Sequence, residues 1–173
     1  KRNWVSRNGL DIALACSSTS SRSILLGRAA EYAELFYSLA FFPQNTSLPL
    51  YTIGVCCENH GLSPKLLLLS DTPLLLVGFN SQIIGLPSPP IGINFDIKLP
   101  HLFYSFQYLL KLHTILVFHE LGAMSITPNG HIVWEYDASD VLVAWDIEEE
   151  TVTIKMIDDA TVRLNLLKGT VAG

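Results

Sequence analysis

Histidine is the residue type of this chain best suited to metal or acid–base chemistry, because imidazole binds metals and titrates near neutral pH. His119-Glu120 begins like the zinc pattern His-Glu-x-x-His, but Ala123 stands where the second histidine is required. No two histidines are four residues apart, the spacing that places both on one helix face. The chain contains His60, His101, His113, His119 and His131. Spacing alone therefore selects no metal ligand and no catalytic residue, and we predict no cofactor.

Strands that lie side by side can still bring distant histidines together. A catalytic zinc needs about three protein ligands and an open position. Asp137 and Asp140 flank a predicted tight turn and could supply carboxylate oxygens. One alternative function is therefore a metal-assisted hydrolase that uses two or three histidines with Asp137 or Asp140.

Nucleophilic chemistry has no recognisable motif in the sequence. The Gly-x-Ser-x-Gly elbow and the glycine-rich phosphate-binding loops are absent. Cys16, Cys56 and Cys57 are too few for a disulfide framework or a four-ligand zinc site. Neighbouring residues of a strand point to opposite faces, so Cys56 and Cys57 are not expected to bind one metal ion together. We therefore expect reduced thiols, a cytoplasmic location and a non-catalytic protein.

Charge is distributed unevenly along the chain. Residues 1–86 hold six Lys and Arg against five Asp and Glu, a net charge of +1, whereas residues 87–173 hold five against eleven, a net charge of −6. An acidic half cannot replace the counterions of phosphate, which argues against a nucleic-acid partner, and it favours encounter with a basic protein. The residues predicted to bind this partner are Glu135, Asp137, Asp140, Glu148, Glu149 and Glu150.

The elements that must position these residues are mainly strands. From about residue 115 to 171, apolar residues alternate in short runs, and turn residues interrupt the runs at regular intervals. This pattern is typical of an antiparallel meander. Apolar runs between turn residues also predict strands at 51–57, 66–70, 74–79 and 82–86.

Three segments complete the predicted fold. An opening hairpin is predicted over residues 4–16, and apolar spacings of three and four over residues 24–40 predict an amphipathic helix. Segment 98–112 fits a helix or a strand, and its aromatic content favours a strand. The predicted fold class is mainly β: an antiparallel meander of about nine to twelve strands. It forms a barrel-like or two-sheet, partly propeller-like domain with one N-terminal helix.

A second alternative function follows from the aromatic residues of the predicted sheets. A closed barrel of strands can hold a small molecule in its interior, and aromatic side chains are frequent in such sites. The side chains predicted to line this cavity are Phe103, Tyr104, Trp134 and Trp145.

Two short segments resemble the blade repeat of quinoprotein-type β-propellers. In 130–136 (GHIVWEY) a Gly-x-x-x-Trp strand follows a turn, and in 164–171 (LNLLKGTV) a leucine and glycine segment would lead to a next blade. The resemblance covers about residues 121–173 and extends to uncharacterised bacterial all-β meander proteins. It implies antiparallel blades or a curved sheet, and it carries over no quinone, metal or catalytic residue.

Length and composition predict one domain over residues 1–173, because this length and an apolar fraction of 49% suffice for a hydrophobic core. Prolines interrupt the uncharged window 72–95, so no membrane-spanning helix is predicted. Leu14-Ala15-Cys16 lacks the apolar stretch that a lipoprotein leader requires. A homodimer through apolar strand edges is compatible with this pattern.

Overall fold

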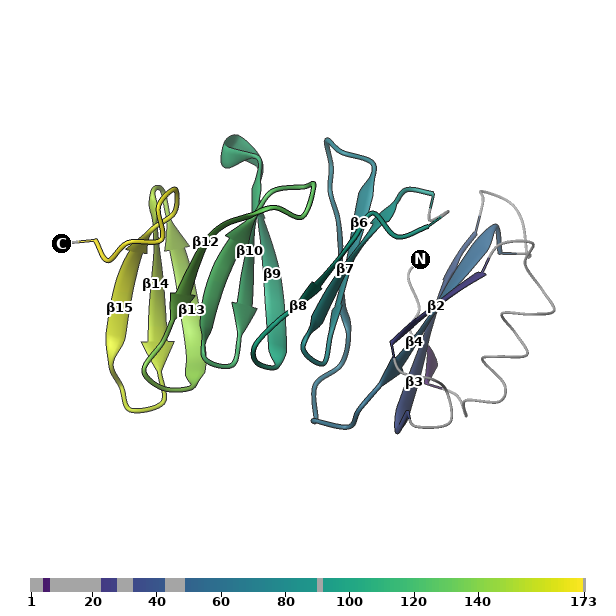
Figure 1. Cartoon of the computed structure of the whole chain (residues 1–173), viewed down its shortest axis with the longest axis horizontal. Coiled ribbons are helices and arrows are strands. Elements are labelled where there is room, and N and C mark those ends of the chain that lie inside the picture. The colour runs from purple at the N-terminus through teal and green to yellow at the C-terminus, as the bar shows by residue number, and fades with distance from the viewer. Residues whose placement is uncertain (1–4, 7–22, 28–32, 43–48, 90–91, 173) are drawn as a thin grey trace.

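Four small β-sheets follow one another along the chain and stand in a row along the long axis of the molecule (Figure 1). The computed structural model describes residues 5–6, 23–27, 33–42, 49–89 and 92–172. We number the sheets 1 to 4 in chain order. Sheet 1 contains β1 (Val5–Ser6), β2 (Ser23–Gly27), β3 (Leu35–Phe41) and β4 (Tyr51–Cys57). Sheet 2 contains β5 (Lys65–Leu68), β6 (Leu74–Phe79), β7 (Gln82–Pro87) and β8 (Phe95–Lys98).

The second half of the chain builds sheets 3 and 4. Sheet 3 contains β9 (Phe103–Leu109), β10 (Thr114–His119), β11 (Gly122–Ile126) and β12 (Ile132–Asp137). The short 3-10 helix η2 (Leu110–Leu112) joins β9 to β10. Sheet 4 contains β13 (Leu142–Glu148), β14 (Thr151–Met156) and β15 (Thr161–Asn165).

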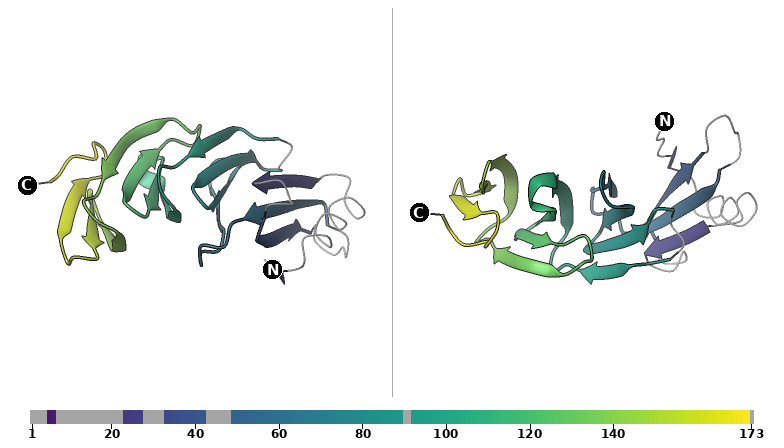
Figure 2. Two further views of the ribbon diagram at one scale, coloured as in Figure 1. Left: turned by 60° about the horizontal axis from the view of Figure 1, so that its bottom comes forward. Right: turned by 90° about the horizontal axis from the view of Figure 1, so that it is seen from above.

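Sheets 2, 3 and 4 are antiparallel meanders in which each strand pairs with the next one in the chain. Sheet 1 has the order β1-β3-β4-β2, and its β2 runs parallel to β4. Figure 2 shows that the row of sheets is curved. None of the four described sheets closes on itself. The predicted barrel is therefore wrong, whereas the mainly β fold is confirmed.

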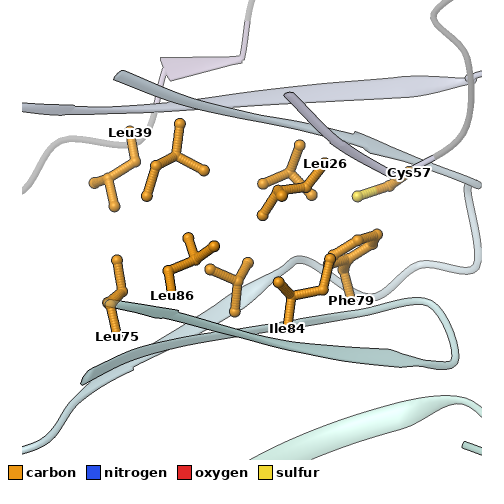
Figure 3. Packing of buried hydrophobic residues seen from close by; sticks show 10 residues of the cluster. Leu26, Leu39, Cys57, Leu75, Phe79, Ile84 and Leu86 are labelled. Carbon is orange, nitrogen blue, oxygen red and sulfur yellow. The ribbon is translucent and has the colours of Figure 1, made fainter. Parts of the chain in front are cut away.

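Hydrophobic clusters fill the junctions between neighbouring sheets. The cluster between sheets 1 and 2 sets Leu26 and Leu39 of sheet 1 opposite Leu75, Phe79 and Leu86 of sheet 2 (Figure 3). We call the other two the 2–3 cluster and the 3–4 cluster. The 2–3 cluster includes Leu76, Ile83, Phe103, Ile115 and Val117. The 3–4 cluster includes Leu116, Phe118, Trp134, Val152, Ile154 and Leu164.

The two inner sheets are covered on both faces by these clusters. All six residues of β6 and all six residues of β10 are buried. Both faces of such a strand lose contact with water, which favours apolar side chains on both. The run LLLVGF of β6 and the central run ILVF of β10 follow from this position in the middle of the row, whereas Thr114 and His119 are buried polar residues at the two ends of β10.

The helix predicted over residues 24–40 is not supported, because 24–27 belong to β2 and 35–40 to β3, while 28–32 lie outside the described residues. The apolar content of this segment is high enough to fit a second period, in which every second residue of β3 is apolar. Leu35, Tyr37, Leu39 and Phe41 pack against sheet 2 in this way. Pairing with β4 satisfies the backbone hydrogen-bonding groups of β2 and β3. It therefore selects the two-residue period of a strand over the period of a helix.

Most of the other strand predictions are confirmed. The bounds predicted for 51–57 and 74–79 match β4 and β6, and those for 66–70 and 82–86 differ from β5 and β7 by one or two residues. Segment 98–112 contains the strand β9, as favoured, followed by η2. Of the predicted hairpin at 4–16, only 5–6 lies within the described residues. No helix among the described residues has the length and apolar character to cross a membrane.

The predicted alternation of β13 holds for only part of the strand. Trp145 and Ile147 face the 3–4 cluster as expected, but Val143 is 50% exposed and Leu142 is buried instead. The pairing of β13 with β14 shifts between Leu142 and Ala144. A bulge of this kind adds one residue and reverses the faces on one side of it.

Candidate functional site

The alternating strand directions of the meander place every second connection at the same end of the row. We call this the lower end, as it stands in Figure 1. It carries the turn between β6 and β7, the connection from β8 to β9, and the connections β10–β11, β12–β13 and β14–β15. The opposite, upper end carries η2 and the hairpin between β13 and β14.

Backbone hydrogen bonds join the lower connections across three sheets. The Phe103 amide donates to the carbonyl oxygen of Asn80 (2.6 Å), which joins sheet 3 to sheet 2. The Glu120 amide donates to the carbonyl oxygen of Leu102 (2.9 Å), and the Glu120 carbonyl oxygen accepts the amide of Leu142 (2.8 Å) at the start of sheet 4. These bonds satisfy backbone groups outside the sheets and fix the connections relative to one another.

Five carboxylates from three successive connections gather at the lower end of sheets 3 and 4. The connections touch one another, because the Ala138 amide donates to the carbonyl oxygen of Leu121 and the Ile157 amide donates to that of Val141 (2.9 Å each). We name the five residues the acidic end: Glu120, Asp137, Asp140, Asp158 and Asp159.

Two of these carboxylates are held by their own turns. An Asp140 side-chain oxygen accepts the Val141 amide (2.7 Å), and an Asp158 side-chain oxygen accepts the Ala160 amide (3.0 Å). Such bonds orient a carboxylate without removing its charge. The cation closest to this group in the described structure is Lys155, whose Nζ lies 2.7 Å from an Asp159 oxygen in an exposed ion pair.

The residues predicted to bind a basic partner are divided between the two ends. Asp137 and Asp140 belong to the acidic end, and Glu135 lies exposed on β12 nearby. Glu148, the last of the seven residues of β13, lies at the upper end together with Glu149 and Glu150. A strand of that length spans roughly 20 Å. The six acids therefore do not form one surface.

The upper group of acids is partly neutralised. Arg163 of β15 donates to a Glu148 oxygen (3.1 Å) and to the hydroxyl of Thr151 (2.9 Å). These three residues line an open depression together with Glu149 and Glu150. The upper group therefore presents less net negative charge than the acidic end.

The structure brings two of the five histidines together. His101, in the connection from β8 to β9, stacks on His119 at the end of β10, with ring centroids 5.8 Å apart and planes 27° apart. His119 is 2% exposed, and its Nδ1 has no hydrogen-bond partner. Burial, followed by the proximity of His101, lowers the pKa of His119, and Asp137 opposes this shift.

The remaining histidines lie apart from this pair. His60 contacts Glu58 near the end of sheet 1 (2.9 Å), His113 belongs to the upper end, and His131 is exposed before β12. Across the described ranges, no three His, Cys, Asp or Glu side chains are arranged to hold a metal ion. Burial, followed by the neighbouring Cys56, raises the pKa of Cys57 to about 12, so this thiol stays protonated.

The aromatic residues predicted to line a ligand cavity belong to two different clusters. Phe103 lies in the 2–3 cluster, whereas Tyr104, Trp134 and Trp145 pack in or against the 3–4 cluster. The Trp134 Nε1 donates to the carbonyl oxygen of Leu166 (2.8 Å). The ring of Trp145 stacks on that of Phe118, with centroids 4.3 Å apart. The four side chains do not face a common space.

The spacing of residues in the sequence did not indicate a polar network that joins sheets 2 and 3 at the upper end. The hydroxyl of Tyr108 lies 2.7 Å from both Asp71 carboxylate oxygens, and the His113 Nδ1 lies 2.9 Å from that hydroxyl and 3.1 Å from an Asp71 oxygen. Burial, followed by the hydrogen bond and charge of Asp71, raises the pKa of Tyr108 to about 12. A phenol with this pKa stays protonated and acts as a donor.

Comparisons with known proteins agree with this architecture. No family model and no curated protein matches the chain. Among solved structures, BamB from Moraxella catarrhalis is similar, with a TM-score of 0.51 and 12% identity. The resemblance to β-propeller blades is thereby confirmed for the fold. The aligned region covers 79% of this chain and only 42% of BamB, so the chain spans less than half the length of that protein.

A second similar structure is a chain from the S. cerevisiae complex of dbp5 bound to nup159 and gle1. Its TM-score is 0.46 at 11% identity, and the alignment covers 62% of this chain and 32% of that one. The similarity to BamB, at 12% identity, concerns the fold alone and transfers no site residue.

Proposed function

We propose that this chain is a non-catalytic protein-interaction module that binds a basic segment of a partner protein at the acidic end. The observation that carries the proposal is the gathering of five carboxylates from three hydrogen-bonded connections, with Lys155 as the cation beside them. Connections at one end of a rigid scaffold are a common place for binding residues.

The charge distribution favours the lower end over the upper one. Glu148 is paired with Arg163 at the upper end, whereas the acidic end retains Glu120, Asp137, Asp140 and Asp158 beside the one ion pair of Asp159. Clustered charges of one sign raise the local concentration of an oppositely charged partner and speed its association. The attraction falls with ionic strength over a Debye length of about 8 Å at physiological salt.

The fixed geometry of the acidic end contributes as well. A partner that binds a preorganised surface loses less conformational freedom than one that must order flexible loops. The backbone bonds from Glu120 to Leu102 and Leu142 hold the central connection in place. We therefore expect a lysine-rich extended peptide to bind without a large rearrangement.

Two matched charge-removal variants test the proposal. The first combines Asp137→Asn, Asp140→Asn and Asp158→Asn, which remove three charges at the lower end and keep a side-chain oxygen at each turn. The second combines Glu148→Gln, Glu149→Gln and Glu150→Gln, which remove three charges at the upper end.

The measurement is the affinity of each variant for an oligolysine peptide at low and at physiological salt. The lower-end variant should bind about tenfold more weakly than the wild type, since three surface charges each contribute up to roughly 0.5 kcal/mol. The upper-end variant should stay within about twofold. Equal losses in both variants, or a larger loss in the upper-end variant, would refute the proposed site.

A further inference from the structure

We propose that the His101–His119 pair is a proton-operated switch that weakens the acidic end and releases its basic partner on acidification. This inference rests on the proposed function, because it describes the regulation of that same site. In this switch the β8–β9 connection moves when the pH falls.

The geometry of the pair holds one imidazole in a place that disfavours its doubly protonated, charged form. His119 lies on the face of β10 that points to the 2–3 cluster, in register with Ile115 and Val117, and is 2% exposed. Its Nδ1 is buried and forms no hydrogen bond. A protonated imidazole donates from both nitrogens, so a cation there would leave a charged donor buried and unpaired.

The titratable groups near His119 come from the β8–β9 connection, the end of β12 and the turn after β10. His101 covers His119 from the β8–β9 connection, and the centroids of the two rings are 5.8 Å apart. A positive charge on one ring would therefore lie close to the other ring. Asp137, the last residue of β12, has the opposite effect, because its negative charge favours the protonated form of His119. Glu120 follows His119 in the chain, and its charge acts on Tyr104 of β9. Burial and His101 outweigh Asp137, so the pKa of His119 lies below the ordinary value.

Release of His119 to solvent requires the β8–β9 connection to move. This connection is held by the amide of Leu99 on the carbonyl oxygen of Ser81 (2.8 Å) on one side of His101. On the other side, the carbonyl oxygen of Leu102 accepts the amide of Glu120 (2.9 Å). The second bond is adjacent to His119 in the chain. The switch predicts that this bond breaks when His101 swings away from a protonated His119.

Opening at Glu120 acts directly on the acidic end. Glu120 is itself one of the five carboxylates, and its carbonyl oxygen holds the amide of Leu142 beside Asp140. The positive charge of a protonated His119 would also cancel part of the local negative charge. Histidine is the side-chain type whose charge ordinarily changes between about pH 7 and pH 5, so a response in this range points to the histidine pair.

The test compares the wild type with a variant that combines His101→Phe and His119→Phe, which keeps two stacked rings and removes both titrations. His60→Gln is the matched control, because His60 lies at the lower end near sheet 1 but outside the stacked pair. The first readout is affinity for an oligolysine peptide at about pH 7.5 and about pH 5.5, on either side of the ordinary histidine pKa. The second readout, without peptide, is the hydrogen-exchange rate of the Glu120 amide, corrected for the intrinsic pH dependence of exchange.

The switch predicts that the wild type and His60→Gln lose affinity about tenfold on acidification, and that their corrected Glu120 exchange accelerates. The double variant should keep its affinity within about twofold and show no acceleration. An equal loss of affinity in the double variant, or unchanged Glu120 exchange in the wild type, would overturn the switch. Absence of peptide binding at about pH 7.5 would instead refute the proposed function. The exchange readout would still decide whether the histidine pair opens this end.

Discussion

Phe103 packs its ring directly onto the backbone of Gly78, where a Cβ atom would come within 2.4 Å of the ring carbons. Gly78 lies in the fully buried β6 of sheet 2, and Phe103 is the first residue of β9 in sheet 3. The contact therefore sets how closely these two sheets approach. The same ring lies at the lower end, one residue after the connection that carries His101 and Leu102.

Substitution of Gly78 by alanine should destabilise the protein by about 1–3 kcal/mol, because the added methyl group must displace a ring inside a packed core. Gly92→Ala is the matched control, since nothing lies within 4 Å of a Cβ at that position. Urea unfolding of both variants measures the difference. Equal stabilities would show that sheets 2 and 3 do not meet in this way. A partial rescue of Gly78→Ala by Phe103→Leu would assign the cost to this pair.

The indole of Trp134 connects sheet 3 to the chain that follows β15. Its Nε1 donates to the buried carbonyl oxygen of Leu166. Trp134→Phe should therefore cost about 1–3 kcal/mol, the usual penalty for an unpaired buried carbonyl group. Trp145→Phe preserves an aromatic ring on Phe118 and should cost less than about 1.5 kcal/mol. The two free energies of unfolding, compared by urea titration, would contradict this assignment if their order were reversed.

The network of Tyr108, Asp71 and His113 predicts a loss of stability at high pH. The pKa of Tyr108 in the folded protein is about 12, above the value of about 10 for an unfolded tyrosine. The unfolded chain therefore releases this proton first. The stabilising contribution is complete below about pH 10 and is lost as the pH rises through 12.

Tyr108→Phe should remove that part of the decline in stability. It should also raise the pKa of Asp71, because the hydrogen bond from Tyr108 is the main cause that lowers it. Carboxyl chemical shifts followed through the acid range measure the second effect. An Asp71 pKa that stays low in Tyr108→Phe would show that the phenol does not donate to this carboxylate.

The thiols of Cys56 and Cys57 should react very slowly in the folded protein. Both side chains are buried, at 0% and 1% exposure, and burial, followed by the neighbouring Cys56, raises the pKa of Cys57 to about 12. The thiolate is the reactive form, so alkylation requires opening of sheet 1. Mass spectrometry after treatment with iodoacetamide should find both unmodified under native conditions and modified in urea. Rapid native modification would contradict their position in β4.

The sequence predicted strands well where turn residues bounded them, and it predicted less well what tertiary pairing decides. The run over β4 and the run over β6 have clear ends, and their bounds were correct. Residues 24–40 satisfy two periods at once, and only the partner strand β4 selects the strand conformation of β2 and β3. In β13, Val143 is the extra residue between Leu142 and Ala144, which pair with successive residues of β14, and a simple alternation cannot include such a bulge.

The candidate site shows a similar division. The acidic character of the second half is visible in its composition, but its separation into two ends follows from the direction of β13 between Asp140 and Glu149. The pairing of His101 with His119 depends on a connection that returns to the end of another strand, so no spacing in the chain indicates it. The sequence indicates the residue types, whereas the order and direction of the strands determine which of these residues lie close together.

The most direct test of the central claim is a titration of the isotope-labelled protein with an oligolysine peptide, followed by amide chemical shifts. We predict that the shifts concentrate in residues 120–121, 137–141 and 157–160, and that residues 148–151 at the upper end change little. The largest changes at 148–151, or small changes spread evenly over all four sheets, would contradict the assignment of partner binding to the acidic end.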